Sequence, residues 1–320
     1  MANHSPEERA VDARANLYQT ITDRIMAELE RGRVPWVQPW DASRTGLGMP
    51  RNATTGRAYS GINILTLWDA VVSRGFGAHS FLTFRQAQTA GGTVRRGEQG
   101  TPVVYAHRFV PAAEKVAAVA EGRDTKGGIP FLKQFTVFNV DQCDGLPDHV
   151  CEPPPPIPAG LILPRANRLI EATKADFRIG GACAFYSPRY DYVQVPRPDD
   201  FMEPINWHRT AFHELGHWTG HGSRLNRDQT GSFGSVDYGR EELVAEMAGA
   251  FLCASLGIVP TVRHSDYLGS WLSIIREDNR AIVRAASAAS KAADYLLACL
   301  EPGGVANENE VLPVFEEMAA

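Results

Sequence analysis

The segment His213-Glu214-Leu215-Gly216-His217 constrains this chain more than any other feature of its sequence. On a helix, side chains four residues apart project from the same face, so His213 and His217 can reach one metal ion together. Glu214 lies beside the first histidine, where a carboxylate can take a proton from metal-bound water. The pattern therefore predicts a helix that carries two ligands for zinc, or for another divalent metal, and a catalytic base.

The residues around this motif predict the helix that it needs. Apolar side chains recur at helical spacing through 204–219, and two glycines follow where the helix would end. Downstream, 241–252 predicts a second helix, which is mostly apolar but carries Glu242 and Glu246 four residues apart. Acidic groups on a buried helix need a partner, and a metal ion with its histidine ligands is a strong one.

This second helix resembles the glutamate helix of the thermolysin-like zinc peptidases, the gluzincins. That helix carries a ligand glutamate, then an acid that orients a ligand histidine, then a small residue; Glu242, Glu246 and Gly249 occupy these places. The resemblance implies Glu242 as the third metal ligand and Glu246 as the acid behind His213 or His217. The linker between the helices is longer than in thermolysin and rich in glycine and serine, so the choice between Glu242 and Glu246 stays open.

A proline run divides the chain. Residues 151–160 contain five prolines, which fit neither a helix nor a central strand and predict a stiff, extended linker. We therefore expect two domains, 1–150 and 161–320, each large enough for its own core. Charge differs across the linker, because the first 150 residues carry a net charge of +2 and the rest −7, within a total of −5.

The N-terminus and the cysteines favour a cytoplasmic protein. The first nine residues are polar and charged, and no apolar run is long enough to cross a membrane. The five cysteines are scattered without a pairing motif, as is typical of reduced thiols in the cytoplasm. The sequence gives no indication of the oligomeric state.

The segment 31–110 is both basic and aromatic. It contains ten arginines, no lysine and only three acidic residues, with nine aromatic side chains among them. Arginine pairs with phosphate through a planar fork and exposed rings stack on bases, so this composition suits single-stranded nucleic acid. The alternative is that the aromatic residues build the core of a small domain. The residues expected on a binding surface are Trp36, Trp40, Arg51, Tyr59, Arg95 and Arg96.

The other segments predict a mixture of helices and strands. Helices are expected at 14–31, 59–72, 83–90, 164–175 and, as one long segment, 274–300. Strands are expected at 102–109, 131–139, 177–179, 184–186 and 192–195.

Motifs spread over residues 18–300 resemble the ArdC-type antirestriction proteins of conjugative plasmids and related mobile elements. They include Pro35-Trp36 with Pro39-Trp40, Arg51-Asn52, Gly61-Ile62-Asn63, Val94-Arg95-Arg96-Gly97, the histidine motif, Ser223-Arg224-Leu225-Asn226-Arg227 and Glu241-Glu242 through Glu246. The resemblance implies an α+β protein with two domains: a small domain that binds single-stranded DNA, then a zincin-like metallopeptidase domain of gluzincin type. The implied role is protection of incoming DNA from host restriction.

The ligand set favours chemistry over a structural metal site. Structural zinc normally has four protein ligands, whereas His213, His217 and Glu242 are three and leave a position for water. The hypothesis is peptide hydrolysis in a protein substrate, with Glu214 carrying the proton. Candidates for the oxyanion donor, by residue type alone, are Tyr238, His264 and Tyr267. Two alternatives stay open: an intracellular zinc endopeptidase whose DNA-binding domain serves localisation, and a binding protein whose zinc is structural.

Overall fold

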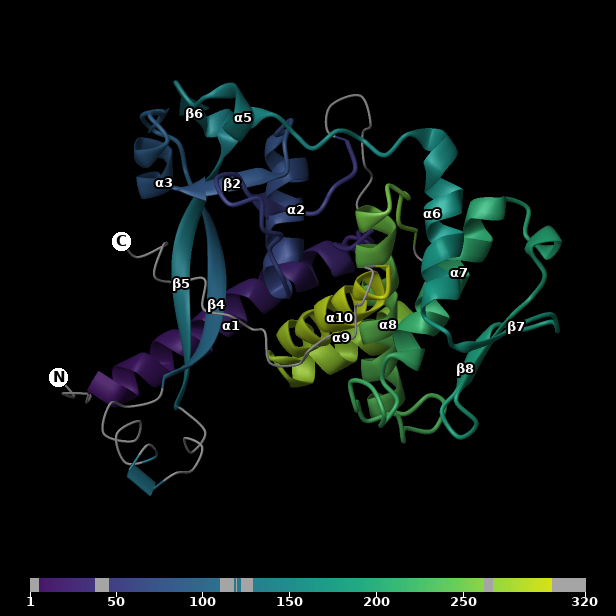
Figure 1. Ribbon diagram of the computed structural model, residues 1–320. Coiled ribbons are helices and arrows are strands. Elements are labelled where there is room, and N and C mark those ends of the chain that lie inside the picture. The colour runs from purple at the N-terminus through teal and green to yellow at the C-terminus, as the bar shows by residue number, and fades with distance from the viewer. Residues whose placement is uncertain are drawn as a thin grey trace.

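The computed structural model describes residues 6–37, 46–109, 118, 120–121, 129–261 and 267–300. The chain has the α+β class that its sequence predicts, with helices and sheets in both halves. Figure 1 shows a twisted sheet of the first half on one side, helices in the middle and a small sheet on the far side. Within the described part of the chain, no helix has the length and apolar character that crossing a membrane requires.

The first half contains a four-stranded sheet in the order β1-β2-β5-β4. Its strands are β1 (Arg51–Asn52), β2 (Ser80–Thr83), β4 (Thr101–Phe109) and β5 (Ile129–Asn139). β1 and β2 are parallel, whereas β5 pairs antiparallel with both β2 and β4. β4 and β5 stay paired along all of β4 and form the long ribbon of Figure 1. A smaller antiparallel pair joins β3 (Thr93–Val94) to β6 (Cys143–Asp144).

Local capping signals set the ends of the helices in the first half. These helices are α1 (Pro6–Glu30), α2 (Ile62–Arg74) and α3 (Phe84–Thr89). α2 ends at Gly75, whose left-handed φ of 67° is free of strain only for glycine. Before α3, the Thr83 hydroxyl accepts a hydrogen bond from the Gln86 amide, and the Gln86 side chain accepts one from the Thr83 amide. α2 and α3 lie close to the predicted 59–72 and 83–90, whereas α1 begins at Pro6, before the predicted start at residue 14.

The second half follows the proline run, in which residues 152–158 form neither helix nor strand. The short helix α5 (Asp148–Cys151) precedes the prolines, and single turns of 3-10 helix lie at Val140–Gln142 and Pro198–Asp200. After the prolines come α6 (Ala159–Ala172), β7 (Asp176–Ile179), β8 (Phe185–Ser187), β9 (Tyr192–Val195), α7 (Pro204–Trp218) and α8 (Val236–Ser255). The three strands form a sheet in the order β7-β9-β8, so β8 is an edge strand.

The last helical segment differs from the prediction. Instead of one helix there are two, α9 (Leu268–Glu277) and α10 (Ala281–Ala298). Asp278 adopts an extended backbone with φ −142° and ψ 101°, and its side chain accepts a hydrogen bond from the amide of Arg280 at 2.9 Å. Aspartate and asparagine favour such turns because their side chains bind the nearby backbone, and Asp278-Asn279 is therefore where the helix breaks.

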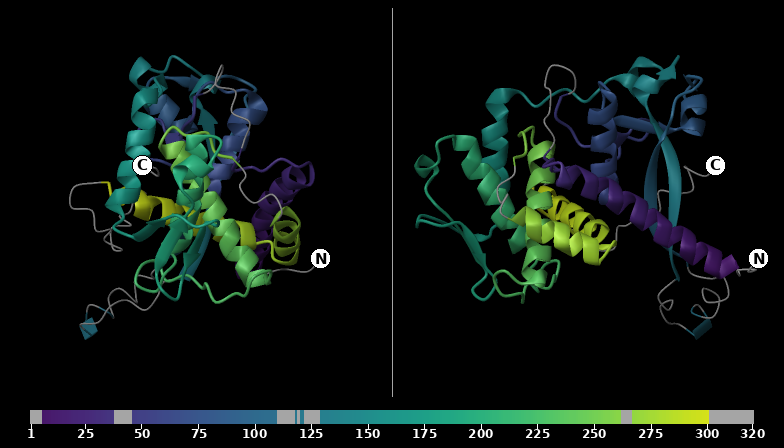
Figure 2. Two further views of the ribbon diagram at one scale, coloured as in Figure 1. Left: turned by 90° about the vertical axis from the view of Figure 1, so that its right-hand side faces the viewer. Right: turned by 180° about the vertical axis from the view of Figure 1, so that it is seen from behind.

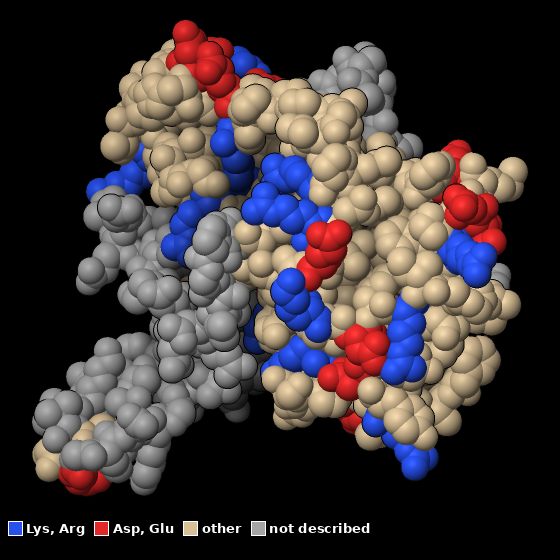
Figure 3. Space-filling model, turned by 45° about the vertical axis from the view of Figure 1, so that its right-hand side comes forward, with Lys and Arg blue, Asp and Glu red and all other residues tan. Residues whose placement is uncertain are grey.

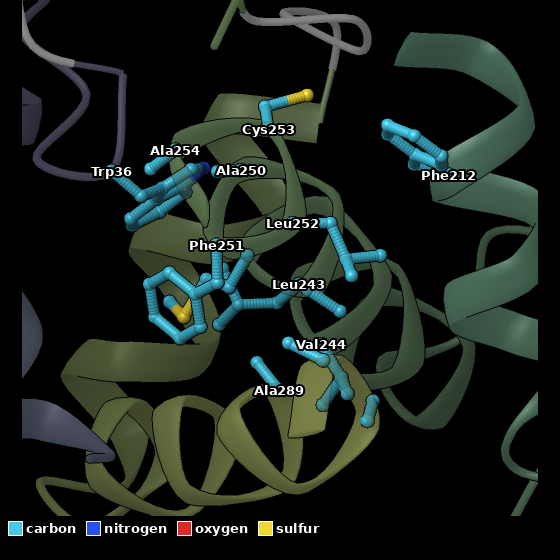
Figure 4. Packing of buried hydrophobic residues seen from close by; sticks show 14 of the residues in the cluster. Trp36, Phe212, Leu243, Val244, Ala250, Phe251, Leu252, Cys253, Ala254 and Ala289 are labelled. Atoms are coloured by element: carbon cyan, nitrogen blue, oxygen red, sulfur yellow. The ribbon is translucent and has the colours of Figure 1, made fainter. Parts of the chain in front are cut away.

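One large hydrophobic core joins the two halves. Trp36 packs edge-on against Trp271 of α9, and Trp68 of α2 packs in the same way against Phe251 of α8, with ring centroids 5.6 Å apart in each pair. Figure 4 shows Trp36 beside Ala250 of α8, and Figures 1 and 2 show α1 running beside α9. Aromatic side chains of the first half therefore help to fill the helical body of the second.

A smaller core lies within the first half, between its sheet and α2. Its buried members are Leu67, Val71, Phe76, Phe81, Val103 and Val137. The largest core is therefore shared between the two halves, whereas this small cluster belongs to the first half alone. The domain boundaries 1–150, 151–160 and 161–320 stay a prediction.

Candidate metal centre and nucleic-acid interface

The metal motif lies where α7 and α8 pack against each other. α7 begins with Pro204, whose missing amide hydrogen costs nothing in the first turn. α8 begins after Ser235, whose hydroxyl accepts a hydrogen bond from the amide of Tyr238 at 3.2 Å. At the crossing, a Cβ atom on Gly216 would lie 3.2 Å from the Cα atom of Ala245. The glycine thus permits the close approach that brings the histidines of one helix to the glutamates of the other.

His213, His217 and Glu242 converge on one point between the helices. The Nε2 atoms of the two histidines are 3.2 Å apart, and each lies 3.4 Å from a different oxygen of Glu242. One ligand atom from each of the three residues lies within 4.8 Å of the others. Ligand atoms around a tetrahedral zinc ion at about 2.1 Å are roughly 3.4 Å apart, so this donor set fits such an ion.

A carboxylate lies behind each histidine ring. Glu246 Oε2 is 3.3 Å from Nδ1 of His213, and Glu241 Oε1 is 3.2 Å from Nδ1 of His217. This arrangement is typical of metal-binding histidines, because a partner on Nδ1 leaves Nε2 free for the metal. The sequence left open which histidine Glu246 faces, and the structure places it behind His213. Sequence reasoning missed Glu241, although it directly precedes Glu242 on the same helix.

The charges in this cluster favour a cation. Burial opposes the charged imidazolium of His213, but hydrogen bonds to Glu242 and Glu246 outweigh burial and raise its pKa to about 10. The pKa of His217 rises to about 9, because Glu241 and Glu242 outweigh burial in the same way. Burial would raise the pKa of Glu242, yet the two histidines lower it. Protons on the histidines thus neutralise the negative charge of the glutamates, and a metal ion can neutralise the same charge.

The centre opens into a cleft of about 470 Å³. Glu214 lines this cleft together with the three converging residues, and the edge strand β8 contributes Phe185 and Tyr186 to the wall. Tyr238 and Tyr267 also line it, with their hydroxyl oxygens 3.4 Å apart. Burial, together with hydrogen bonds to Tyr267 and Glu242, raises the pKa of Tyr238, so its hydroxyl stays protonated at neutral pH. His264, the third candidate oxyanion donor, lies outside the described residues.

The structure corrects the predicted nucleic-acid surface at its aromatic residues. Trp36 has an exposed fraction of 0% because its ring is used in the shared core, so its placement on a binding surface is wrong. Trp40 lies outside the described residues. Tyr59 is partly buried against the small core, and burial raises the pKa of its hydroxyl to about 12. Neither Trp36 nor Tyr59 therefore offers an exposed ring on which a base could stack.

Arg51 is also occupied by the fold. Its guanidinium donates to the Ser80 hydroxyl at 3.1 Å and to the carbonyl of Glu152 at 2.7 Å, which ties the start of the linker to the sheet. The arginine pair beyond β3 is exposed as predicted, on a turn where Gly97 has a φ of 89°. Of that pair, Arg95 forms ion pairs with Glu98 at 3.0 Å and Asp144 at 3.3 Å.

Arg96 is exposed beside Arg95. Two further exposed residues of the same lobe were missed, Phe84 and Arg85 at the start of α3, which contacts β3. Phe84 is 49% exposed, which leaves a ring surface that a base could stack on. Their position directly after the Thr83 cap could have suggested exposure. Figure 3 shows basic side chains spread over one face of the molecule, with acidic side chains among them.

Comparisons with known proteins identify the family. The model for the N-terminal domain of anti-restriction factor ArdC matches residues 15–138, and that for a zincin-like metallopeptidase matches residues 164–288. The zincin-like domain implies a divalent metal. An uncharacterised protein of Sinorhizobium fredii, y4eC, is 35% identical over 297 residues, which cover 90% of this chain and 94% of y4eC. The DNA primase TraC of Escherichia coli is 37% identical over 88% of this chain, which spans only 27% of TraC.

Two crystal structures of the antirestriction protein ArdC from plasmid R388 resemble this fold, one metal-free and one with Mn(II) bound. Each has a TM-score of 0.73 and 37% sequence identity, and covers 89% of this chain. The match covers 97% of the metal-free ArdC chain and 98% of the Mn(II)-bound one. The chain therefore belongs to the ArdC antirestriction family, with an ArdC N-terminal domain followed by a zincin-like metallopeptidase domain.

Proposed function

We propose that this chain protects incoming DNA of a mobile element from host restriction by binding single-stranded DNA and by metal-dependent cleavage of a protein substrate. The observation that carries the enzymatic part is the convergence of His213, His217 and Glu242 in an open cleft that Glu214 also lines. Three protein ligands leave a coordination position for water, as catalytic zinc sites do.

His213, His217 and Glu242 would hold the ion. Two imidazoles and one carboxylate form a ligand set typical of catalytic zinc, so Zn²⁺ is the proposed metal, with other divalent ions as alternatives. A divalent ion bound there supplies Lewis acidity, which makes water a better nucleophile at neutral pH. Glu214 would accept the proton from the attacking water and pass it to the leaving amine. Tyr238, protonated and in the cleft, would donate a hydrogen bond to the carbonyl oxygen of the substrate.

The substrate would be an extended peptide segment lying along β8. This strand borders the cleft and pairs on one side with β9, so its other edge is available for backbone hydrogen bonds within the described sheet. Edge strands bind extended peptides in this way. The partly exposed ring of Phe185 on β8 would contact an apolar side chain of the substrate.

The proposed DNA surface lies on the lobe formed by α3 and the turn after β3. Exposed Arg95, Arg96 and Arg85 would contact phosphates, and the ring of Phe84 would stack on a base. The alternative is an endopeptidase that uses this surface only for localisation, which the intact base Glu214 in an open cleft also supports.

The test compares protection of incoming plasmid DNA in restricting and non-restricting recipients, for the wild type and for Glu214→Gln. The variant keeps all three proposed ligands, and we expect it to bind metal and DNA normally but to lose protection. Arg240→Ala, which removes an exposed ion pair on α8, is the control and should protect normally. If Glu214→Gln protects as well as the wild type, peptide hydrolysis has no part in antirestriction.

A further inference from the structure

We propose that Arg227 is a positioning residue that holds Glu241 against His217 and so sets the orientation of this histidine toward the metal. The inference rests on the proposed metal centre but assigns a role to the segment Ser223-Arg224-Leu225-Asn226-Arg227, which that proposal does not use. This segment begins shortly after the end of helix α7 at Trp218, and the side chains of both of its arginines are largely buried.

A continuous set of polar contacts joins Arg227 to the metal side of His217. The Arg227 guanidinium donates through Nε to Glu241 Oε2 at 3.0 Å and through Nη2 to Glu241 Oε1 at 2.7 Å. Glu241 Oε1 in turn lies 3.2 Å from Nδ1 of His217. On the other side of the ring, Nε2 faces the proposed ligand Glu242 at 3.4 Å. A carboxylate fixed on Nδ1 keeps the hydrogen there and leaves Nε2 free for a metal ion.

Arg227 is itself fixed to the end of α7. Its Nη2 donates to the carbonyl of Gly216 at 2.7 Å, and its Nη1 donates to the Thr219 hydroxyl at 2.8 Å. Gln229 adds a parallel contact, because its side-chain amide donates to the His217 carbonyl at 2.7 Å and to Glu241 at 3.0 Å. The planar fork of arginine can make all these bonds at once, whereas the point charge of lysine cannot.

The buried carboxylate of Glu241 needs this partner. Its side chain is 10% exposed and that of Arg227 is 11% exposed, so neither charge is well solvated. Without the guanidinium, the glutamate would lose two of its hydrogen-bond donors and would be free to turn away from His217. This change removes the acceptor from Nδ1 and frees the imidazole ring to rotate.

Arg224, the other arginine of the segment, provides a matched comparison. Its side chain is 8% exposed, donates to the Trp218 carbonyl at 2.6 Å, and pairs with Asp191, which also accepts from the Tyr186 hydroxyl at 2.9 Å. Arg224 is therefore as buried as Arg227 and joins the cleft wall to the same helix end, but its carboxylate partner Asp191 is 35% exposed, and its bonds do not include Glu241 or His217. Its loss should cost stability without loosening the histidine.

The experiment measures the affinity of the full chain for Zn²⁺ by competition with a chelator, together with the unfolding temperature of the metal-free protein. We expect Arg227→Ala and Glu241→Gln to weaken Zn²⁺ binding by about 10- to 100-fold, the range seen when such supporting groups are removed. Arg224→Ala should lower the unfolding temperature to a similar extent as Arg227→Ala but leave the Zn²⁺ affinity unchanged. Arg227→Lys should bind more tightly than Arg227→Ala and less tightly than the wild type.

The isosteric Glu241→Gln decides the question even where Arg227→Ala does not fold, because it preserves volume but leaves only one oxygen, so the side chain cannot accept from both Arg227 Nε and His217 Nδ1. Wild-type Zn²⁺ affinity in Glu241→Gln, or equal losses in Arg224→Ala and Arg227→Ala, would overturn the positioning role alone. A wild-type chain that binds no divalent ion would overturn the metal centre itself, and this inference with it.

Discussion

Replacing Trp36 with alanine should destabilise both halves of the chain together. The ring is fully buried and packs edge-on against Trp271, which belongs to the second half. A buried aromatic side chain hides about 150–250 Å², and at roughly 25 cal/mol per Å² this corresponds to about 4–6 kcal/mol. The indole N–H has no hydrogen-bond partner among the described residues, so its removal recovers about 1–3 kcal/mol of that loss. The net destabilisation should therefore be about 3 kcal/mol.

Urea unfolding of the metal-free protein, followed by circular dichroism, measures this loss, and hydrogen exchange locates it. We expect faster exchange both in β4 and β5 of the first half and in α8 of the second. Phe84→Ala is the control, because this aromatic residue of the same half is 49% exposed and packs against Phe138 of β5, so its replacement should leave exchange in α8 at the wild-type rate. If exchange in α8 stays at the wild-type rate while only the N-terminal sheet is affected, the shared core does not couple the two halves.

Three other perturbations act on the ligand set, on the charge of the histidines and on the DNA surface. Glu242→Ala should weaken Zn²⁺ binding, measured by chelator competition, more than Glu246→Ala does. Loss of a ligand reduces the affinity by more than the roughly 10- to 100-fold that follows loss of a group supporting a ligand. The reverse order would mean that Glu246 is the ligand and Glu242 the supporting group. For the metal-free protein, kept so by a chelator, the unfolding temperature should fall as pH rises from 6.5 through about 9 and 10. The reason is that His217 and His213, whose pKa values are raised in the folded state, stabilise the fold only while they are protonated. An unfolding temperature that does not change with pH would show that these charges do not stabilise the fold. For binding of single-stranded DNA, Arg96→Ala should flatten the slope of log affinity against log salt concentration by about one unit. Arg95→Ala should flatten it by less, because Arg95 is ion-paired within the protein. An unchanged slope in both variants would mean that the DNA binds to another surface.

The local parts of the metal centre could be predicted from the sequence, because a helix fixes the relation between residues four apart. Spacing thus places His213 beside His217 on one helix and Glu242 beside Glu246 on the other, whereas the meeting of the two pairs was expected only from the resemblance to the gluzincins. Glu241 could not be assigned in this way, since its role depends on Arg227 from another segment.

The fate of the aromatic residues depends on tertiary packing. Composition alone cannot tell a stacking platform from a core residue, and Trp36 is buried because a helix more than two hundred residues away covers it. The break at Asp278 was missed for a related reason, because apolar periodicity continues across it while the turn preference of one Asp-Asn pair ends the helix.

We propose that one divalent ion binds between α7 and α8. Elemental analysis of the purified chain after Zn²⁺ loading and removal of free metal tests it directly. We expect one Zn²⁺ per chain in the wild type and in Glu214→Gln, and none in His217→Ala. Equal metal content in His217→Ala and the wild type, or none in the wild type, would contradict it.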